Sequence, residues 1–353
     1  MRYKLGEVAK IRYGKDHKKL DDGNIPVYGS GGIMRYVDTA LYDKKSVLIP
    51  RKGSLGNLFF ANKPFWTVDT LFYTEIDENI LMPEFLFYKL KMFNLASMNV
   101  GSAVPSLTTA ILNALELDIP SFEVQSQIVN ILKAFDERIS LNKQINHHLL
   151  EQARLLYKNL ISSNDTKYQN LSDIARITMG QSPKGETYND DKIGLPLLNG
   201  ATDFRNSISP SKWTSDPRKI ARPGEYVFGV RATIGLTTKI FKEYAIGRGT
   251  GSAKPISNIF DEYLFFALED LFDYYANLGS GTVYINISKS DFDSFKVILP
   301  IKDQFLVDFH KTVQPLFNLI FNNNAEIQKL SELRDCLLPK LLPGEISINQ
   351  ATK

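Results

Sequence analysis

The sequence predicts an α+β protein in which two similar mixed α/β domains are separated by a pair of long antiparallel α-helices, a coiled coil, with a pseudo-two-fold internal repeat. Two observations predict this fold. Landmark residues recur in the same order in both halves of the chain, and each half ends in a long stretch whose apolar residues follow a helical period. A chain of 353 residues is also long enough for two domains with separate cores.

The composition is that of an ordinary globular protein, with 43% hydrophobic and 23% charged residues, which excludes disordered and collagen-like classes. A net charge of +3 is only mildly basic and does not by itself indicate a polyanionic partner. The single cysteine, Cys336, excludes a disulfide framework and a thiolate zinc site. The first residues lack the apolar core of a signal peptide, and no apolar run reaches the length of a membrane span. We therefore expect a cytoplasmic protein that does not contact a membrane.

Short motifs carry the internal repeat. The run Leu5–Ile11, followed by Gly14, corresponds to Leu171–Ile177, followed by Gly180. Four further pairs follow in the same order: Ile25–Val27 with Leu195–Leu197, Arg51–Gly56 with Val230–Gly235, Gly101-Ser102 with Gly279-Ser280, and Ile119-Pro120 with Leu299-Pro300. Because chance similarity would not preserve this order, we interpret the chain as a duplication.

Within each repeat, a mixed domain precedes a helix. Short β-branched and aromatic runs such as Ser46–Ile49 and Glu225–Phe228 predict strands, while Pro83–Phe93 and Asp261–Leu271 predict helices. We expect a first domain at 1–120, a central helix at 121–163, a second domain at 164–300, a C-terminal helix at 301–345 and a tail at 346–353.

The long helices are predicted from a heptad-like pattern. Residues Gln127–Ile161 contain neither glycine nor proline and place apolar residues at alternating spacings of four and three. Such a helix, roughly 50 Å long at about 1.5 Å per residue, cannot bury its stripe against one small domain. We therefore expect the two helices to pair antiparallel. The predicted pairing residues are Ile128, Leu132, Phe135, Ile139, Asn146, Leu149, Leu156, Leu160, Phe309, Leu316, Ile320, Asn323, Ile327, Leu330 and Leu337.

Two polar residues and one proline interrupt this pattern. Asn146 and Asn323 occupy equivalent positions, and a polar pair inside the seam would fix its register. The alternative is that both asparagines are solvated beside the seam and that Ile145 packs in place of Asn146. Pro315 is expected to kink the second helix or to mark its effective start.

Two segments resemble a known family. Near the start of Leu117–Ile139 a proline is followed by glutamines, and a short acidic segment lies near its end. The segment Leu333–Ile346 is leucine-rich and has Gly-Glu near its end. Together with the duplication, they resemble the specificity (S) subunits of type I restriction-modification enzymes, over essentially the whole chain. The second copy of the first segment, Leu299–Phe305, departs from the pattern because it is three residues shorter and keeps a single glutamine.

The resemblance implies a function. The chain would be a non-catalytic subunit whose two target recognition domains each read half of a bipartite site in double-stranded DNA, while the helices set the spacing between the halves. The helices would also dock two methyltransferase (M) subunits, which bring S-adenosylmethionine and methylate adenine, so this chain itself would bind no cofactor or metal. The family also allows restriction (R) subunits, which are translocating nucleases, to join the complex.

Loops that combine a basic side chain with glycine and small hydroxyls suit DNA, because glycine lets backbones approach and hydroxyls bond phosphate. The candidate DNA-binding residues of the first domain are Lys15, Lys18, Lys19, Ser30, Arg35, Tyr36, Arg51, Lys52 and Ser54. Those of the second are Lys184, Arg231, Thr233, Arg248, Thr250, Ser252, Ser280 and Tyr284. The matched pair Lys52 and Arg231, with its neighbours Ser54 and Thr233, is the strongest choice because it recurs while its surroundings differ. The alternative for any one loop is an ordinary solvated turn.

Other features favour structural roles or are absent. We expect Trp66 and Trp213 to be core anchors, and His147-His148 to be solvated or packed in the helix pair rather than a metal pair. Residues Gly29–Gly32 do not form a phosphate loop, and there is no zinc-ligand, adenine-methyltransferase or nuclease motif. Two rival hypotheses remain: a coiled-coil protein–protein adaptor that does not read DNA, and a nuclease of unfamiliar sequence that acts alone.

Overall fold

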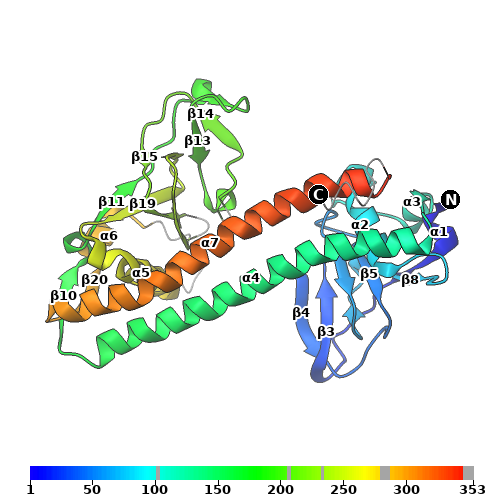
Figure 1. The fold of residues 1–353 in the computed structure, drawn as a ribbon, viewed down its shortest axis with the longest axis horizontal. Coiled ribbons are helices and arrows are strands. Elements are labelled where there is room, and N and C mark those ends of the chain that lie inside the picture. The colour runs from blue at the N-terminus through cyan, green and yellow to red at the C-terminus, as the bar shows by residue number, and fades with distance from the viewer. Residues whose placement is uncertain (101–103, 205–207, 232–233, 279–286, 345–353) are drawn as a thin grey trace. The chain divides into compact units, whose positions relative to one another are not determined.

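A computed structural model describes residues 1–100, 104–204, 208–231, 234–278 and 287–344 (Figure 1). The chain forms two compact units, one of Met1–Ile139 with Lys329–Lys353 and one of Ser140–Gln328. The boundary between the units crosses both long helices, α4 (Phe122–Ser162) and α7 (Asp303–Leu341). Each unit therefore contains one mixed α/β domain together with one part of α4 and one part of α7.

The first unit is built on a four-stranded antiparallel sheet in the order β2-β8-β5-β6. Its strands are β2 (Ala9–Tyr13), β8 (Leu71–Ile76), β5 (Ser46–Pro50) and β6 (Phe59–Ala61). A smaller sheet joins β4 (Gly32–Val37), β3 (Asp22–Gly29) and β7 (Trp66–Thr67), and β3 pairs with β7 in parallel. The first and last strands of the domain, β1 (Arg2–Lys4) and β9 (Glu116–Asp118), form a separate antiparallel pair.

Short helices cover the larger sheet of the first unit. Helix α2 (Pro83–Lys91) packs on β5 and β6, and α1 (Leu5–Val8) contacts α3 (Thr109–Asn113). A 3-10 turn, η1 (Leu95–Met98), follows α2. The core combines the buried faces of these helices with the first turns of α4 and the last turns of α7, because apolar burial is the dominant favourable term in folding.

The second unit repeats this plan with additions. Its four-stranded sheet has the order β11-β19-β16-β17, with β11 (Ala175–Met179), β19 (Thr250–Pro255), β16 (Tyr226–Val230) and β17 (Ile234–Lys239). A five-stranded sheet joins β12 (Tyr188–Asn189), β14 (Lys212–Thr214), β13 (Leu195–Leu198), β18 (Tyr244–Ile246) and β15 (Ile220–Ala221). The first and last strands of this domain, β10 (Thr166–Asn170) and β20 (Lys296–Pro300), form a separate antiparallel pair. The helices are α5 (Asp261–Leu278) and α6 (Lys289–Ser294), with 3-10 turns η2 (Leu171–Asp173), η3 (Gly185–Thr187), η4 (Ala201–Asp203) and η5 (Asn258–Phe260).

The two units share one topology, as the duplicated sequence predicts. In each four-stranded sheet the first strand pairs with the fourth, the fourth with the second and the second with the third. In the other sheet of each unit, β3 or β13 pairs with the next strand antiparallel and with a later strand in parallel. The expected strands at 46–49 and 225–228 and the expected helices at 83–93 and 261–271 correspond to β5, β16, α2 and α5.

The first sequence landmark has the same structural role in both copies. The backbone N–H of Leu5 donates to Leu115, and that of Leu171 donates to Phe295, each at 2.8 Å. Nine residues further on, a Cβ on Gly14 or on Gly180 would lie 2.1 Å from a backbone carbonyl oxygen, where no side chain fits. These glycines recur because a neighbouring chain passes too close for any side chain.

Antiparallel contacts between α4 and α7 occur within each unit. In the first unit, Arg334 of α7 forms an ion pair with Asp136 of α4 at 2.6 Å. In the second unit, Tyr157 lies further along α4 and packs against Phe309, which lies earlier in α7. All the predicted pairing residues are buried or half-buried, and fully buried Val313 and nearly fully buried Asn142 join them.

The asparagine layer resolves the alternative left open by the sequence. In the second unit, Asn323 donates to Asn146 Oδ1 at 2.8 Å, and Asn146 donates to Asn324 Oδ1 at 2.8 Å. The side chain of Ile145 is 38% exposed, so it does not replace Asn146 in the seam. Helix α7 begins at Asp303, so Pro315 does not mark its start but lies inside it, where proline removes one backbone hydrogen bond.

We predict that the asparagine pair stabilises the second unit. Asn146→Ala should reduce the free energy of unfolding by about 1–2 kcal/mol, because it leaves Asn323 without its acceptor in the seam. Replacing both Asn146 and Asn323 by leucine should recover this loss, since an apolar pair leaves no polar group unsatisfied. Urea unfolding of the full chain measures both effects, with exposed Asn130→Ala on the same helix as the control. Equal losses for Asn130→Ala and Asn146→Ala would contradict the assignment.

Candidate nucleic-acid interface

An arginine at the edge of the first domain is held in place from two sides. Arg51 follows β5, and its guanidinium lies 5.3 Å from the centroid of the Tyr13 ring at the end of β2. Its Nη1 donates to the backbone oxygen of Asp69 at 3.1 Å. An arginine carries five N–H donors, so this geometry orients the side chain and leaves most of its donors for a ligand. The aromatic partner, Tyr13, is 52% exposed and was not singled out by sequence reasoning.

The turn between β3 and β4 meets the loop that follows Arg51. Asn57 donates to the backbone oxygen of Ser30 at 3.2 Å. Gly53 has a φ of +85°, and its N–H donates to Pro105 at 3.1 Å, which brings the exposed Lys52 and Ser54 to the same edge as Ser30. The structure therefore brings together Ser30, Arg51, Lys52 and Ser54 from two separate loops, as a binding surface requires.

Glycine at the tip of the β3–β4 turn has no packing reason inside the domain. A Cβ on Gly31 would meet no atom within 4 Å, and its φ lies outside the left-handed region. Gly32, in contrast, has a φ of +117° that favours glycine. A glycine that the fold does not require is suited to close approach by an external backbone.

The same hairpin exposes Tyr36, which the sequence predicted as a DNA-binding residue, beside two apolar side chains that sequence reasoning missed, Ile33 and Met34. Ile33, Met34 and Tyr36 are 50%, 60% and 51% exposed along β4. A two-stranded ribbon fits the major groove, and apolar side chains can contact thymine methyl groups there. The signal available in the sequence was the apolar run immediately after the glycine turn.

Other predicted residues of the first domain have different surroundings. Arg35 forms an ion pair with Asp22 at 2.7 Å and donates to the backbone oxygen of Leu20 at 3.1 Å, so its Nη2 is used, and its charge is balanced, within the domain. Lys15, Lys18 and Lys19 are exposed in the turn after β2. Their turn is anchored by Trp66, whose Nε1 donates to Lys15 at 3.0 Å.

In the second domain, Arg231 directly follows β16 and is exposed, in the position equivalent to Lys52 after β5. Arg248 is exposed, and Lys184 is exposed with Glu186 3.7 Å away. Trp213 is half-buried beneath the amine of Lys192. Trp66 is half-buried and packs against the small core of Val27, Val37 and Val68, so the expected core packing is confirmed for Trp66. Thr233, Ser280 and Tyr284 lie outside the described residues.

Thr250 and Ser252 require a correction, because both are buried in β19. The Ser252 hydroxyl donates to the buried carboxylate of Glu225 at 2.8 Å and is not available to DNA. Small residues occupy this strand for packing: a Cβ on Gly251 would lie 2.4 Å from the ring of Phe228. The Gly-Thr-Gly-Ser segment is thus a core strand, and we leave both hydroxyls out of the proposed interface.

Strongly shifted titratable groups lie where the domains join the long helices. Burial raises the pKa of Tyr88 and Tyr157 well above the usual range; these tyrosines donate to Asp136 at 2.7 Å and to Asp270 at 2.6 Å. Burial also raises the pKa of Glu262, which contacts His310 of α7 at 2.5 Å. These groups are packed between elements and are not exposed in a cleft. This indicates that they attach each domain to the long helices rather than act as catalytic acids or bases.

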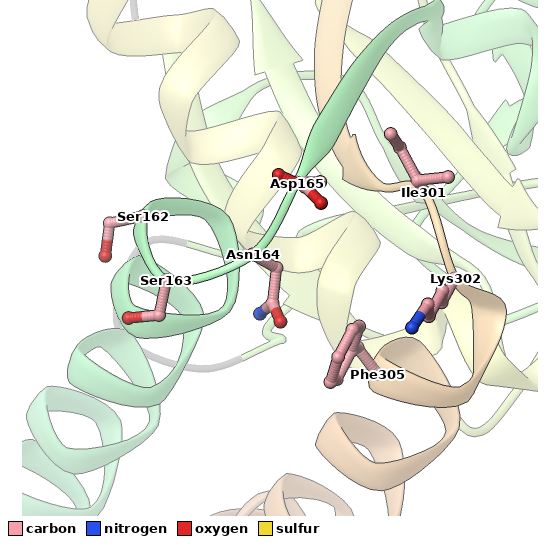
Figure 2. Close-up of a pocket in the computed structure, with 7 residues that line it drawn as sticks. All are labelled: Ser162, Ser163, Asn164, Asp165, Ile301, Lys302 and Phe305. Atoms are coloured by element: carbon pink, nitrogen blue, oxygen red, sulfur yellow. The ribbon is translucent and has the colours of Figure 1, made fainter.

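A polar cleft of about 450 Å³ lies in the second unit, between the end of α4 and the start of α7 (Figure 2). Figure 2 shows Asn164 and Lys302 facing each other across it; the lining residues are Ser162, Ser163, Asn164, Asp165, Ile301, Lys302 and Phe305. This set offers no nucleophile–base pair. Among the described residues, no three His, Cys, Asp or Glu side chains are placed to hold a metal ion.

Comparison with known proteins gives one consistent result. The chain matches the family described as the type I restriction modification DNA specificity domain over residues 1–151 and 164–332. It is 24% identical to the HindI specificity subunit of Haemophilus influenzae, covering 84% of this chain and 85% of that one. It is 26% identical to the MjaIX specificity subunit of Methanocaldococcus jannaschii, covering 88% and 79%. The crystal structure of a type I S subunit from M. genitalium shares the fold, with a TM-score of 0.64, 17% identity and coverage of 97% and 96%. No helix in the described part of the chain is long and apolar enough to cross a membrane.

Gly31→Ala should separate stability from DNA binding. Thermal unfolding should stay unchanged or improve slightly, by about 0.4–1 kcal/mol, because the methyl group meets open space and restricts the unfolded chain. Affinity for duplex DNA should fall by about 1.5–3 kcal/mol, the contribution of a hydrogen bond to a charged phosphate that the methyl group would block. Fluorescence anisotropy at fixed salt measures the affinity, with exposed Asn24→Ala on the preceding strand β3 as the control. Unchanged affinity in Gly31→Ala would remove the β3–β4 turn from the interface.

Proposed function

Because this chain belongs to the type I restriction modification DNA specificity family, we propose that its two recognition domains, residues 1–120 and 164–300, each read one half of a bipartite DNA site. The chain is a DNA specificity subunit of a type I restriction-modification system and is itself non-catalytic. The observation that carries the proposal is the repeated topology, in which Lys52 and Arg231 follow equivalent strands while the surrounding loops differ. A shared frame with different edges is what reading two different half-sites requires.

The proposed readers differ in kind between the domains. In the first, the oriented Arg51, the glycine turn at Gly31 and the exposed β4 ribbon would face the DNA. An arginine that contacts guanine with two hydrogen bonds contributes about 1–3 kcal/mol of discrimination. In the second, Arg231 and Arg248 would offer exposed guanidinium groups to the bases, and lysines in both domains would contact phosphates.

The helices at 121–163 and 301–345 would hold the gap between half-sites constant. They would also dock two methyltransferase subunits that bring S-adenosylmethionine and methylate adenine, and restriction subunits would join that complex. The antiparallel contacts of α4 with α7 within each unit support a rigid spacer, since a packed, hydrogen-bonded seam resists bending.

The central test assembles the chain with its cognate methyltransferase subunit. We expect the complex to methylate a split DNA sequence, whereas the purified chain alone should neither cut nor methylate DNA. Exchanging residues 1–120 for another recognition domain should change one half-site and leave the other intact. Sequencing of methylated genomic DNA reads out both results. A complex that methylates without sequence preference would favour the adaptor hypothesis. Cleavage of DNA by the purified chain alone would favour the nuclease hypothesis. Changes in both half-sites after the exchange would contradict the proposal that each domain reads one half-site.

A second test lengthens the spacer. Seven residues inserted in α4 and seven in α7, both at the level of the Asn146–Asn323 pair, keep the seam in register. The insertion adds about 10 Å of helix, close to three base-pair steps of about 3.4 Å. The gap in the methylated motif should therefore grow by three base pairs with unchanged half-sites. As a control, seven residues inserted at the exposed turn around Lys192 should leave the gap unchanged; a constant gap in the helix variant would refute the spacer role.

A further inference from the structure

The first turn of α4 contains a glutamine with no exposed surface, Gln125. Its Oε1 accepts a hydrogen bond from the backbone N–H of Met82 at 2.8 Å. Its Nε2 donates to the backbone oxygens of Ile80 at 2.9 Å and Pro120 at 3.1 Å. Both N–H groups and one oxygen lone pair of the amide are thus satisfied. Gln125 connects the start of α4 to the backbone of the first domain at two separate places.

The segment that Gln125 holds is itself fixed to the sheet. It connects β8, an inner strand of the four-stranded sheet, to α2. Within it, the N–H groups of Ile80 and Leu81 donate to Asp77, at 3.1 Å and 3.0 Å, and Asp77 donates to Val8 at 2.9 Å. Gln125 therefore bonds α4 to backbone atoms that are themselves hydrogen-bonded next to the sheet, rather than to a side chain that could rotate.

Helix α4 begins only two residues after Pro120, so the contacts of its first turns set its orientation relative to the domain. Ile128, Val129 and Leu132 bury the next turns of α4 against the domain. Apolar burial is non-directional and tolerates small rotations, whereas hydrogen bonds weaken steeply when they are bent. The three bonds of Gln125 therefore help to define the angle between α4 and its domain at the start of the helix, while the hydrogen bond from Tyr88 to Asp136 holds α4 further along.

The second copy lacks this arrangement. Gln304, in the first turn of α7, is exposed and donates to Asp308 of the same helix at 2.8 Å. The second domain is joined to α7 through side chains instead, with Glu262 at the start of α5 contacting His310 at 2.5 Å. The shorter sequence before α7 accounts for the difference, because it leaves no buried glutamine beside the domain.

We propose that Gln125 is a positioning residue for DNA recognition: it fixes the angle at which the first recognition domain joins α4, and thereby the gap between half-sites that the assembled enzyme accepts. This inference rests on the proposed function. It concerns only the spacing of the two half-sites, since Gln125 is buried and reads no base.

The test uses the chain assembled with its methyltransferase subunits and a DNA library. Both half-sites are kept constant while the gap between them varies from two base pairs shorter to two longer than the native gap. For Gln125→Ala, the preference for the native gap over a gap one base pair longer should fall about tenfold, the equivalent of one lost buried hydrogen bond. The base preference at every position of both half-sites should stay as in the wild type.

Three further variants make the result specific. Gln125→Met fills the same space but makes none of the three hydrogen bonds, so it should also loosen the gap, and it serves if the alanine variant does not fold. Gln127→Ala changes an exposed glutamine two residues away and should behave as the wild type. Leu112→Ala creates a cavity in the same core on α3 and should lower stability without loosening the gap.

Unchanged gap preference in both Gln125 variants would overturn the inference, as would equal loosening by Leu112→Ala. A wild-type complex that methylates without any fixed gap would refute the proposed function, and this inference with it. The two failures are distinguishable because the first appears only in the variants and the second already appears in the wild type.

Discussion

Two helices of 41 and 39 residues carry apolar stripes that neither could leave in water. Burying each Leu, Ile, Val or Phe of such a stripe contributes about 1.5–3 kcal/mol, so the antiparallel contact between α4 and α7 contributes to the core of both units. Apolar contact alone would allow the helices to slide by a heptad. The asparagine pair at Asn146 and Asn323 removes that freedom, because any other register would leave half-buried amides without these partners. Register is therefore set by a few polar atoms within a largely apolar seam.

Each unit then needs a way to hold its recognition domain against this helix pair. The structure uses buried polar contacts for this in both units: Tyr88 with Asp136 in the first, and Tyr157 with Asp270 in the second. The tyrosine comes from the domain helix α2 in one case and from α4 in the other, so the duplication conserved the kind of contact but not its direction. A buried hydrogen bond that excludes water is hard to break one partner at a time, which keeps the attachment rigid.

The sequence predicted the features that depend on local periodicity and on order along the chain. The heptad pattern located both long helices to within a few residues, and the recurring Leu5 and Leu171 motifs located the same turn in both domains. It could not predict which basic loops converge, because that depends on how strands pair. Arg35 looks like a free cation in the sequence, but its strand lies beside β3 and Asp22 takes up its charge. The Gly-Thr-Gly-Ser segment looks like a loop, yet its small residues serve the close packing of Phe228 in a central strand.

The two copies keep some parts of the fold and differ in others, and the difference follows from how closely the backbone is packed at each position. Strand order and the glycines at positions 14 and 180 are constrained by backbone atoms about 2 Å from any added side chain, so both copies keep them. The side chains of Lys52 and Arg231 are exposed at the edge loops, so one replaces the other between the copies without cost to the core. The junctions lie between these extremes, since a backbone lock at Gln125 and a side-chain contact at His310 both attach a domain to a helix. In the proposed function, base specificity would change at the edges while spacing would change at the junctions, so the two properties could vary independently of each other.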